Sequence, residues 1–251
     1  MTVKTANDIR LMEKTCQLAA QTLEHVSKYV KAGITTDELD KIVYDYTMTA
    51  EATPAPLNYK GFPKSICTSV NDCICHGVPD DYVLKDGDII NVDVTTYKNG
   101  FHGDTSRTFI IGDVPDSTRH LVDSAKKAME KGIEAITPNG TTGDIGFAIN
   151  KFVTRKGYYA VEEIGGHGIG RNFHEDPFVP SFGKKGRGDR LLTWGTITVE
   201  PMLNETNQPI REFDIPKSEI KYYLTGDQTL SAQFEHTILI TDTGYEILTL
   251  P

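Results

Sequence analysis

Residues 89–111 read IINVDVTTYKNGFHGDTSRTFII, two β-rich runs that are joined by Asn-Gly at 99–100. Asn-Gly between such runs is the strongest short-range signal for a β-hairpin with a two-residue turn. With that turn, Thr95 faces Asp104 across the hairpin. Because side chains alternate between the two faces of a strand, Asp93 shares a face with Thr95 and lies diagonal to Asp104. The hairpin therefore predicts two carboxylates on one surface of a sheet.

The setting of Asp93 favours a bound cation. Apolar residues surround it in the run Ile89–Val94, where an unpaired carboxylate is costly and its pKa rises. A cation would offset that cost. Exposure to solvent is the alternative for any single strand aspartate, and three further residues weigh against it.

These three residues are polar. Two of them lie in apolar runs that are expected to be buried, and the third lies where a ligand can approach the backbone closely. His167 lies in the glycine-rich stretch 165–170, which leaves its imidazole accessible and does not match a phosphate-binding loop. Glu200 ends an apolar run, and Glu235 interrupts the apolar run 234–240. Together with the hairpin aspartates they bring a charge of about −4, which two divalent ions would balance.

A carboxylate-rich ligand set with one imidazole and no thiolate suits Mn²⁺, Fe²⁺, Co²⁺ or Zn²⁺ better than copper. Two such ions ~3.5 to 4 Å apart make a water nucleophilic near neutral pH and hold both oxygens of a tetrahedral intermediate. The expected chemistry is hydrolysis.

The rest of the chain shows helical and then strand-like patterns, in that order, twice. Helical periodicity, in two cases after a capping box, occurs over 9–30, 35–46, 121–133 and 141–152. Strand-like runs occur at 66–76, 88–97, 101–111, 158–164, 196–200 and 231–240. This order predicts one α+β domain over 1–251, with comparable halves of about 1–115 and 116–251 around a shared sheet.

Composition narrows the class of protein. The chain has 251 residues, 38% hydrophobic and 24% charged, which is typical of a folded globular protein. Its net charge of −9 repels nucleic acid and anionic membrane surfaces. No apolar run is long enough for a membrane span, and the first residues lack an apolar signal core. We expect a cytoplasmic protein without a nucleic-acid or membrane partner.

Five motifs, in the same order along the chain, resemble those of type I methionine aminopeptidases. They cover nearly the whole sequence and are Cys75-His-Gly-Val-Pro79, Asn91-Val-Asp-Val94 with Gly103–Phe109, Gly166–Pro177, Thr198-Val-Glu-Pro-Met202 and Ser231–Ile238. The resemblance implies the pita-bread fold, an α+β architecture of two pseudo-symmetric halves around a central curved antiparallel sheet. It also implies an enzyme that removes the initiator methionine of nascent polypeptides when the second residue is small. We expect the protein to be a monomer.

The resemblance further assigns metal ligands. Asp93 would bind one metal ion through both carboxylate oxygens. Asp104 and Glu235 would bridge the two ions. His167 and Glu200 would complete the coordination of the other ion.

Substrate contacts are implied in the same way. Glu200 would also handle protons, while His76 and His174 would bind the substrate amide and stabilise the intermediate. The pocket for the methionine side chain would comprise Tyr59, Phe62, Cys67 and Phe173.

The spacing of the motifs indicates which subtype of methionine aminopeptidase the chain resembles, and two regions differ from the usual pattern of relatives. The short stretch between His174 and Glu200 excludes the helical insertion of type II enzymes, and the chain resembles the short bacterial form without an amino-terminal extension. Trp194-Gly195 departs from the Gly-Met-x-Phe pattern usual in relatives, which affects the expected pocket. Region 203–228 is less basic than in relatives thought to approach ribosomes, so only transient ribosome proximity is expected.

Two other interpretations remain open. The first is a proline-directed peptidase of the same fold, such as aminopeptidase P or prolidase, although those enzymes carry long amino-terminal domains. The second is a binding protein that kept the pita-bread scaffold and lost catalysis. Such proteins lose metal ligands, whereas all five positions here carry an acid or a histidine.

Overall fold

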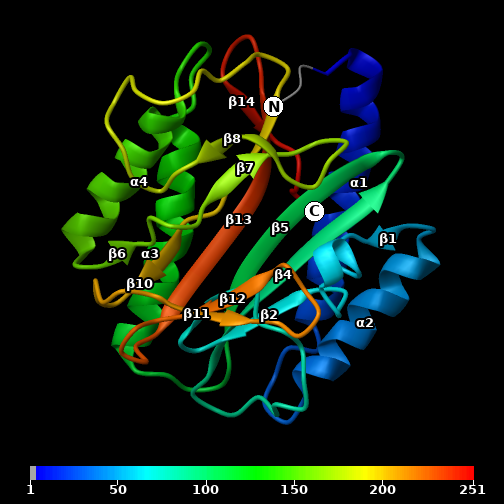
Figure 1. Cartoon of the computed structure of the whole chain (residues 1–251), viewed down its shortest axis with the longest axis vertical. Helices are drawn as coiled ribbons and strands as arrows, with labels where there is room; N and C mark the ends of the chain where they lie inside the picture. Colours follow the sequence, from blue (N-terminus) through cyan, green and yellow to red (C-terminus); the bar gives the residue numbers. More distant parts are fainter. Residues whose placement is uncertain (1–3) are drawn as a thin grey trace.

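A large, mainly antiparallel sheet runs through the centre of the computed structural model, which describes residues 4–251 (Figure 1). The strands are β1 (Thr53–Pro54), β2 (Cys67–Val70), β3 (Cys73–Cys75), β4 (Ile89–Lys98), β5 (Phe101–Ile110), β6 (Tyr159–Ala160), β7 (Gly166–Gly168), β8 (Glu175–Val179), β9 (Thr196–Val199), β10 (Met202–Asn204), β11 (Arg211–Asp214), β12 (Lys221–Leu224), β13 (Ser231–Ile240) and β14 (Tyr245–Ile247). Along the central sheet the order is β1-β4-β5-β13-β9-β7-β8, and a smaller sheet has the order β11-β12-β3. The expected α+β class with a central antiparallel sheet is confirmed.

The hairpin of β4 and β5 has the predicted register. Thr95 pairs with Asp104, and Asp93 pairs with Ser106. Asn99 and Gly100 both have positive φ, 56° and 81°, as a tight two-residue hairpin turn requires. Both aspartates are thereby placed on one face of the sheet.

Helices pack on the sheet in two pairs (Figure 1). They are α1 (Ala6–Ser27), α2 (Thr36–Thr49), α3 (Asp116–Glu134) and α4 (Thr142–Lys156), with a short 3₁₀ helix, η1 (Tyr59–Gly61). Helix α1 contacts β4, β5 and α2, whereas α3 contacts β13 and α4. Each pair contributes to its own apolar cluster, as two helix-and-strand units should. Within residues 4–251, no helix is both long and apolar enough to cross a bilayer.

Capping boxes begin α2 and α4, as predicted, and a further one, formed by Thr5 and Asp8, begins α1. The Thr35 hydroxyl accepts from Glu38 N while Glu38 accepts from Thr35 N, and Thr141 and Asp144 form the same reciprocal pair. The first helix ends at Ser27, earlier than expected. Helix α3 begins at 116 rather than 121 because its first turn is polar and carries no apolar periodicity.

Two predicted strands are wrong in extent. The run 66–76 is divided into β2 and β3 because Asn71 adopts φ 53° and its amide side chain bonds Asp88 and Ile89 N, which creates a turn. The run 158–164 forms only the two-residue strand β6. Beyond it, Val161 N donates to Met202 O, and residues 161–165 continue as irregular backbone toward β7.

Candidate active site

A cavity of about 210 Å³ lies on the face of the sheet that carries Asp93 and Asp104. Every site residue expected from the sequence lines it. These are Tyr59, Phe62, Cys67, His76, Asp93, Asp104, His167, Phe173, His174, Glu200 and Glu235. Residues that sequence analysis did not assign to the site also line it, namely Pro56, Thr95, Ile164, Gly165 and Ile220.

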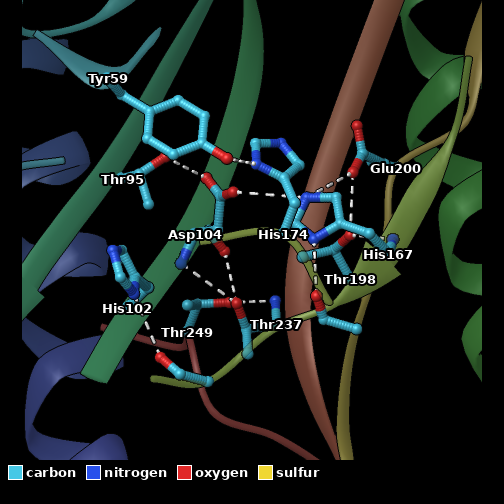
Figure 2. Close-up of polar contacts among 12 residues, drawn as sticks. Tyr59, Thr95, His102, Asp104, His167, His174, Thr198, Glu200, Thr237 and Thr249 are labelled. Carbon is cyan, nitrogen blue, oxygen red and sulfur yellow. Dashed lines mark hydrogen bonds and ion pairs between the residues drawn. The ribbon is translucent and has the colours of Figure 1, made fainter. Parts of the chain in front are cut away.

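Asp104, Glu200 and His167 line this cavity and point toward one another (Figure 2). One ligand atom from each of Asp104, His167 and Glu235 lies within 4.8 Å of the others. His167 Nε2 is 3.9 Å from Asp104 Oδ2 and 3.6 Å from Glu200 Oε1. His167 Nδ1 lies 2.9 Å from Gly168 O, so it carries the proton and leaves Nε2 free to bind a cation.

Burial raises the pKa of all four carboxyl groups. For Asp104 it raises the pKa to about 7, and for Glu200 burial together with the nearby Asp104 raises the pKa to about 8. The pKa values of Asp93 and Glu235 lie well above the usual range, through burial and then through the charge of Asp104. Like charges in a desolvated site cannot all ionise without a compensating cation.

The cluster fits divalent metal ions. Asp93 Oδ1 and Glu235 Oε1 are buried and have no hydrogen-bond partner among residues 4–251. An orphaned buried carboxylate oxygen is costly, and a metal ion would supply the missing partner. The donor set, carboxylate oxygens with one imidazole nitrogen, is suited to Mn²⁺, Fe²⁺, Co²⁺ or Zn²⁺.

Neighbouring side chains orient three of the other carboxylate oxygens, on Asp104 and Glu200. The Thr95 hydroxyl donates to Asp104 Oδ1 over 2.7 Å. The Thr198 hydroxyl donates to Glu200 Oε1 over 2.8 Å, and Gln233 Nε2 donates to Glu200 Oε2 over 3.1 Å. Such outer partners hold metal-binding groups in a fixed orientation.

Two further histidines lie beside the cluster. His76 has φ 57°, and its Nδ1 lies 2.9 Å from Lys221 O, so Nε2 is its unprotonated nitrogen. His174 is exposed at the edge of the cavity, and its Nδ1 lies 3.1 Å from the Tyr59 hydroxyl. Desolvation lowers the pKa of both imidazoles, so each stays neutral at physiological pH.

Aromatic and apolar side chains form another wall of the cavity. Tyr59 and Phe173 lie 4.9 Å apart by ring centroids, and Phe173 stacks on His174 at 4.4 Å. Phe62 and Cys67 are buried in the same apolar cluster. Trp194 does not line the cavity: its ring is partly exposed, and its backbone bonds Lys4 and Ile240.

The chain is similar to known peptidases. The model of metallopeptidase family M24 matches residues 10–242. Methionine aminopeptidase of Rickettsia prowazekii is 44% identical, with all of this chain and 96% of that protein aligned. Methionine aminopeptidase A of Synechocystis is 45% identical, with 100% and 98% aligned.

Solved structures agree with these similarities. The crystal structure of the Rickettsia prowazekii methionine aminopeptidase matches with a TM-score of 0.96 at 43% identity and covers both chains completely. The prolidase of Pyrococcus horikoshii shares the fold with a TM-score of 0.76 at 20% identity. This chain covers 99% of its own length but only 63% of the prolidase.

Proposed function

The chain belongs to metallopeptidase family M24 and is similar over its whole length to methionine aminopeptidases, and from this we propose that it removes the amino-terminal methionine from polypeptides. One observation carries the proposal: two buried carboxylate oxygens that have no hydrogen-bond partner in the described part of the chain lie in a cluster of acids and one imidazole beside an apolar cavity. Such a site combines a place for catalytic cations with a pocket for an apolar side chain.

Five side chains would hold two divalent ions, namely Asp93, Asp104, His167, Glu200 and Glu235. When bound, the ions would supply electrophilic activation of the scissile carbonyl and of the attacking water. Their identity, among manganese, iron(II), cobalt and zinc, is left open by the donor set.

The protein's own groups move protons and orient the substrate. Glu200 has both oxygens held, by Thr198 and Gln233, and is placed to take a proton from water and return it to the leaving amine. His76 Nε2 would accept from the peptide N–H. If Tyr59 donates to His174 Nδ1, then His174 Nε2 carries the proton and can donate to the developing oxyanion.

Selectivity for methionine would come from the apolar wall. Tyr59, Phe62, Cys67 and Phe173 would surround an unbranched thioether, and contacts between sulfur and aromatic rings add ~0.3 to 1.5 kcal/mol. Methionine should therefore be preferred over Leu, Lys and Glu at the first position. At the second position, Ala, Gly, Ser and Thr should be accepted, and Lys, Arg and Leu rejected.

Release of free methionine from Met-Ala-Ser, measured with each metal in turn and with a chelator, tests the proposal. Turnover should require metal and stop on chelation. A metal-free protein that hydrolyses the peptide at the full rate would contradict the metal mechanism. Faster cleavage of Ala-Pro peptides than of Met-Ala-Ser would favour a proline-directed peptidase, and no turnover with any divalent metal would favour a non-catalytic binding protein.

A substrate of this kind also suggests where the protein works. Amino-terminal methionines of nascent chains become accessible as synthesis proceeds, so we propose a cytoplasmic monomer with transient ribosome proximity. Sedimentation of the purified protein alone tests the monomeric state, and sedimentation with ribosomes tests the ribosome proximity.

A further inference from the structure

An exposed aromatic ring stands on the catalytic face of the sheet, outside the residues described so far. Phe178 is 45% exposed and is the direct cross-strand partner of His167 in the pairing of β8 with β7. Directly paired residues of an antiparallel ladder project to the same face. Pro177 and Val179, its neighbours in β8, are buried, as alternation requires for the opposite face.

The position of β8 explains why the ring is uncovered. Strand β8 is the last in the path of the central sheet, next to β7 (Figure 1). No further strand of the described chain follows it to cover Phe178. Large exposed aromatic side chains often contact a binding partner, because they bury a large apolar area on binding.

Phe178 adjoins the catalytic cavity through Gly165. Two atoms of its ring lie 3.2 Å from the position that a Cβ on Gly165 would occupy. Gly165 lines the cavity together with Ile164, whereas Phe178 itself does not. A continuous surface therefore leads from the cavity wall over Gly165 to the ring.

A polypeptide bound in the cavity can leave it along this surface. Figure 2 shows Tyr59, of the apolar wall, and His167 on opposite sides of Asp104. With the first side chain against the apolar wall, a chain that runs past His167 would pass over Gly165, which lines the cavity just before β7. An extended peptide advances ~3.3 Å per residue, so a second residue at Gly165 would bring the third to the neighbouring Phe178 ring.

We propose that Phe178 forms a subsite for the third residue of the substrate and favours apolar and aromatic side chains there. The inference rests on the proposed aminopeptidase function and adds a sequence preference to it. Aromatic pairing of this kind should raise kcat/KM about two- to tenfold. The preferred substrates are then polypeptides that begin with methionine, a small residue and an apolar or aromatic residue.

The experiment compares kcat/KM for Met-Ala-Phe-Gly and Met-Ala-Ser-Gly at one fixed metal concentration. The unchanged protein should prefer the Phe peptide about two- to tenfold. Phe178→Ala should bring this ratio close to one, and Phe178→Tyr should keep it. Tyr159→Ala is the matched control because Tyr159 is also a strand residue with 45% exposure, and it should leave the ratio unchanged.

Three results would overturn the subsite. Phe178→Ala could keep the full preference, or it could lower kcat/KM for both peptides by the same factor, as a purely structural residue would. Alternatively, the variant could change the preference between Met-Ala-Ser-Gly and Met-Val-Ser-Gly instead, which would place the ring at the second residue. Failure of the unchanged protein to cleave any methionine peptide would overturn the proposed function and, with it, this subsite.

Discussion

The carboxylates of the cluster divide into two kinds by their hydrogen bonds. Asp104 and Glu200 are held by donors from Thr95, Thr198 and Gln233. Asp93 and Glu235 each keep a buried oxygen without a partner in the described chain. The hydrogen bonds fix the orientation of Asp104 and Glu200, and these oxygens of Asp93 and Glu235 remain available to a cation. A cation would therefore bind to ligands that are already oriented.

Removing a carboxylate from this cluster should abolish most activity. Asp104→Ala and Glu235→Ala are each expected to lower kcat/KM by more than about 100-fold, because loss of a mere outer partner already costs ~10- to 100-fold. Cys73→Ala serves as the control, since Cys73 is also buried but does not line the cavity. Peptide assays at saturating metal measure the effect, and losses equal to that of the control would refute the ligand roles.

The Thr198 hydroxyl should contribute to metal affinity, because it contacts two of the expected metal ligands. It donates to Glu200 Oε1 and accepts from His167 N, so Thr198→Val removes the orientation of two metal ligands at constant shape. We expect a ~10- to 100-fold loss of metal affinity, measured by titration calorimetry with Mn²⁺.

Thr196→Val controls for buried strand threonines. Thr196 is fully buried in the same strand, and its hydroxyl bonds Ile169 O rather than a ligand. Its removal should reduce stability but not metal affinity. A similar loss of affinity in both variants would show that orientation of Glu200 is not the cause.

At the scale of elements, hairpin β4–β5 could be predicted because its information is local. Asn99 and Gly100 determine the turn, and alternation then places Asp93 and Asp104 on one face. The capping boxes of α2 and α4 are equally local. Elements whose sequence carries a local signal of this kind, a turn or a capping box, could therefore be predicted correctly.

Elements that depend on tertiary contacts could not be predicted in this way. Ile164 and Gly165 lie in irregular backbone, and they line the cavity only because β7 pairs with β8 and β9. Strands β11 and β12 have partly exposed, mixed sequences without clear alternation, and β12 is held by β3. Ile220, immediately before β12, consequently carried no signal for the site.

Helix α4 offers a stability prediction at this scale. Asp144 accepts from Thr141 N and from Gly186 N, so it both caps the helix and holds the 184–190 loop. Asp144→Ala should lower the free energy of unfolding by about 1 kcal/mol, measured by urea denaturation at pH 7. Asp144→Asn, which retains an acceptor oxygen, should lose less.

The pKa of Asp144 determines how the stability contributed by this residue depends on pH. Burial opposes ionisation, but hydrogen bonds from Gly186 and Thr141 outweigh it and hold the pKa below the usual value. Because the folded pKa is depressed, the stabilisation is complete above the unfolded pKa and is lost as pH falls through the folded pKa. The deficit of Asp144→Ala should therefore shrink at pH 3, and a deficit that grows there would contradict the cap.

At the scale of the whole molecule, the site exists only in the complete fold. Its five expected ligands lie on β4, β5, β7 and β13 and directly after β9. Both helix-and-strand units therefore contribute, and β5 and β13 join them through direct pairing. Binding of metal to such a site is coupled to global unfolding, since the unfolded chain cannot assemble the ligands.

Metal should consequently raise the melting temperature. Mn²⁺ at about one hundred times its Kd adds ~2.7 kcal/mol, which corresponds to a Tm increase of about 5 to 10 °C for a chain of this size. The double variant Asp93→Asn with Glu235→Gln should show no such rise. Without metal it should be at least as stable as the unchanged protein, because two buried carboxyl groups, whose ionisation is opposed by burial and by Asp104, are replaced by neutral amides. Scanning calorimetry with and without Mn²⁺ distinguishes these states, and an equal rise in both proteins would place the stabilising metal elsewhere.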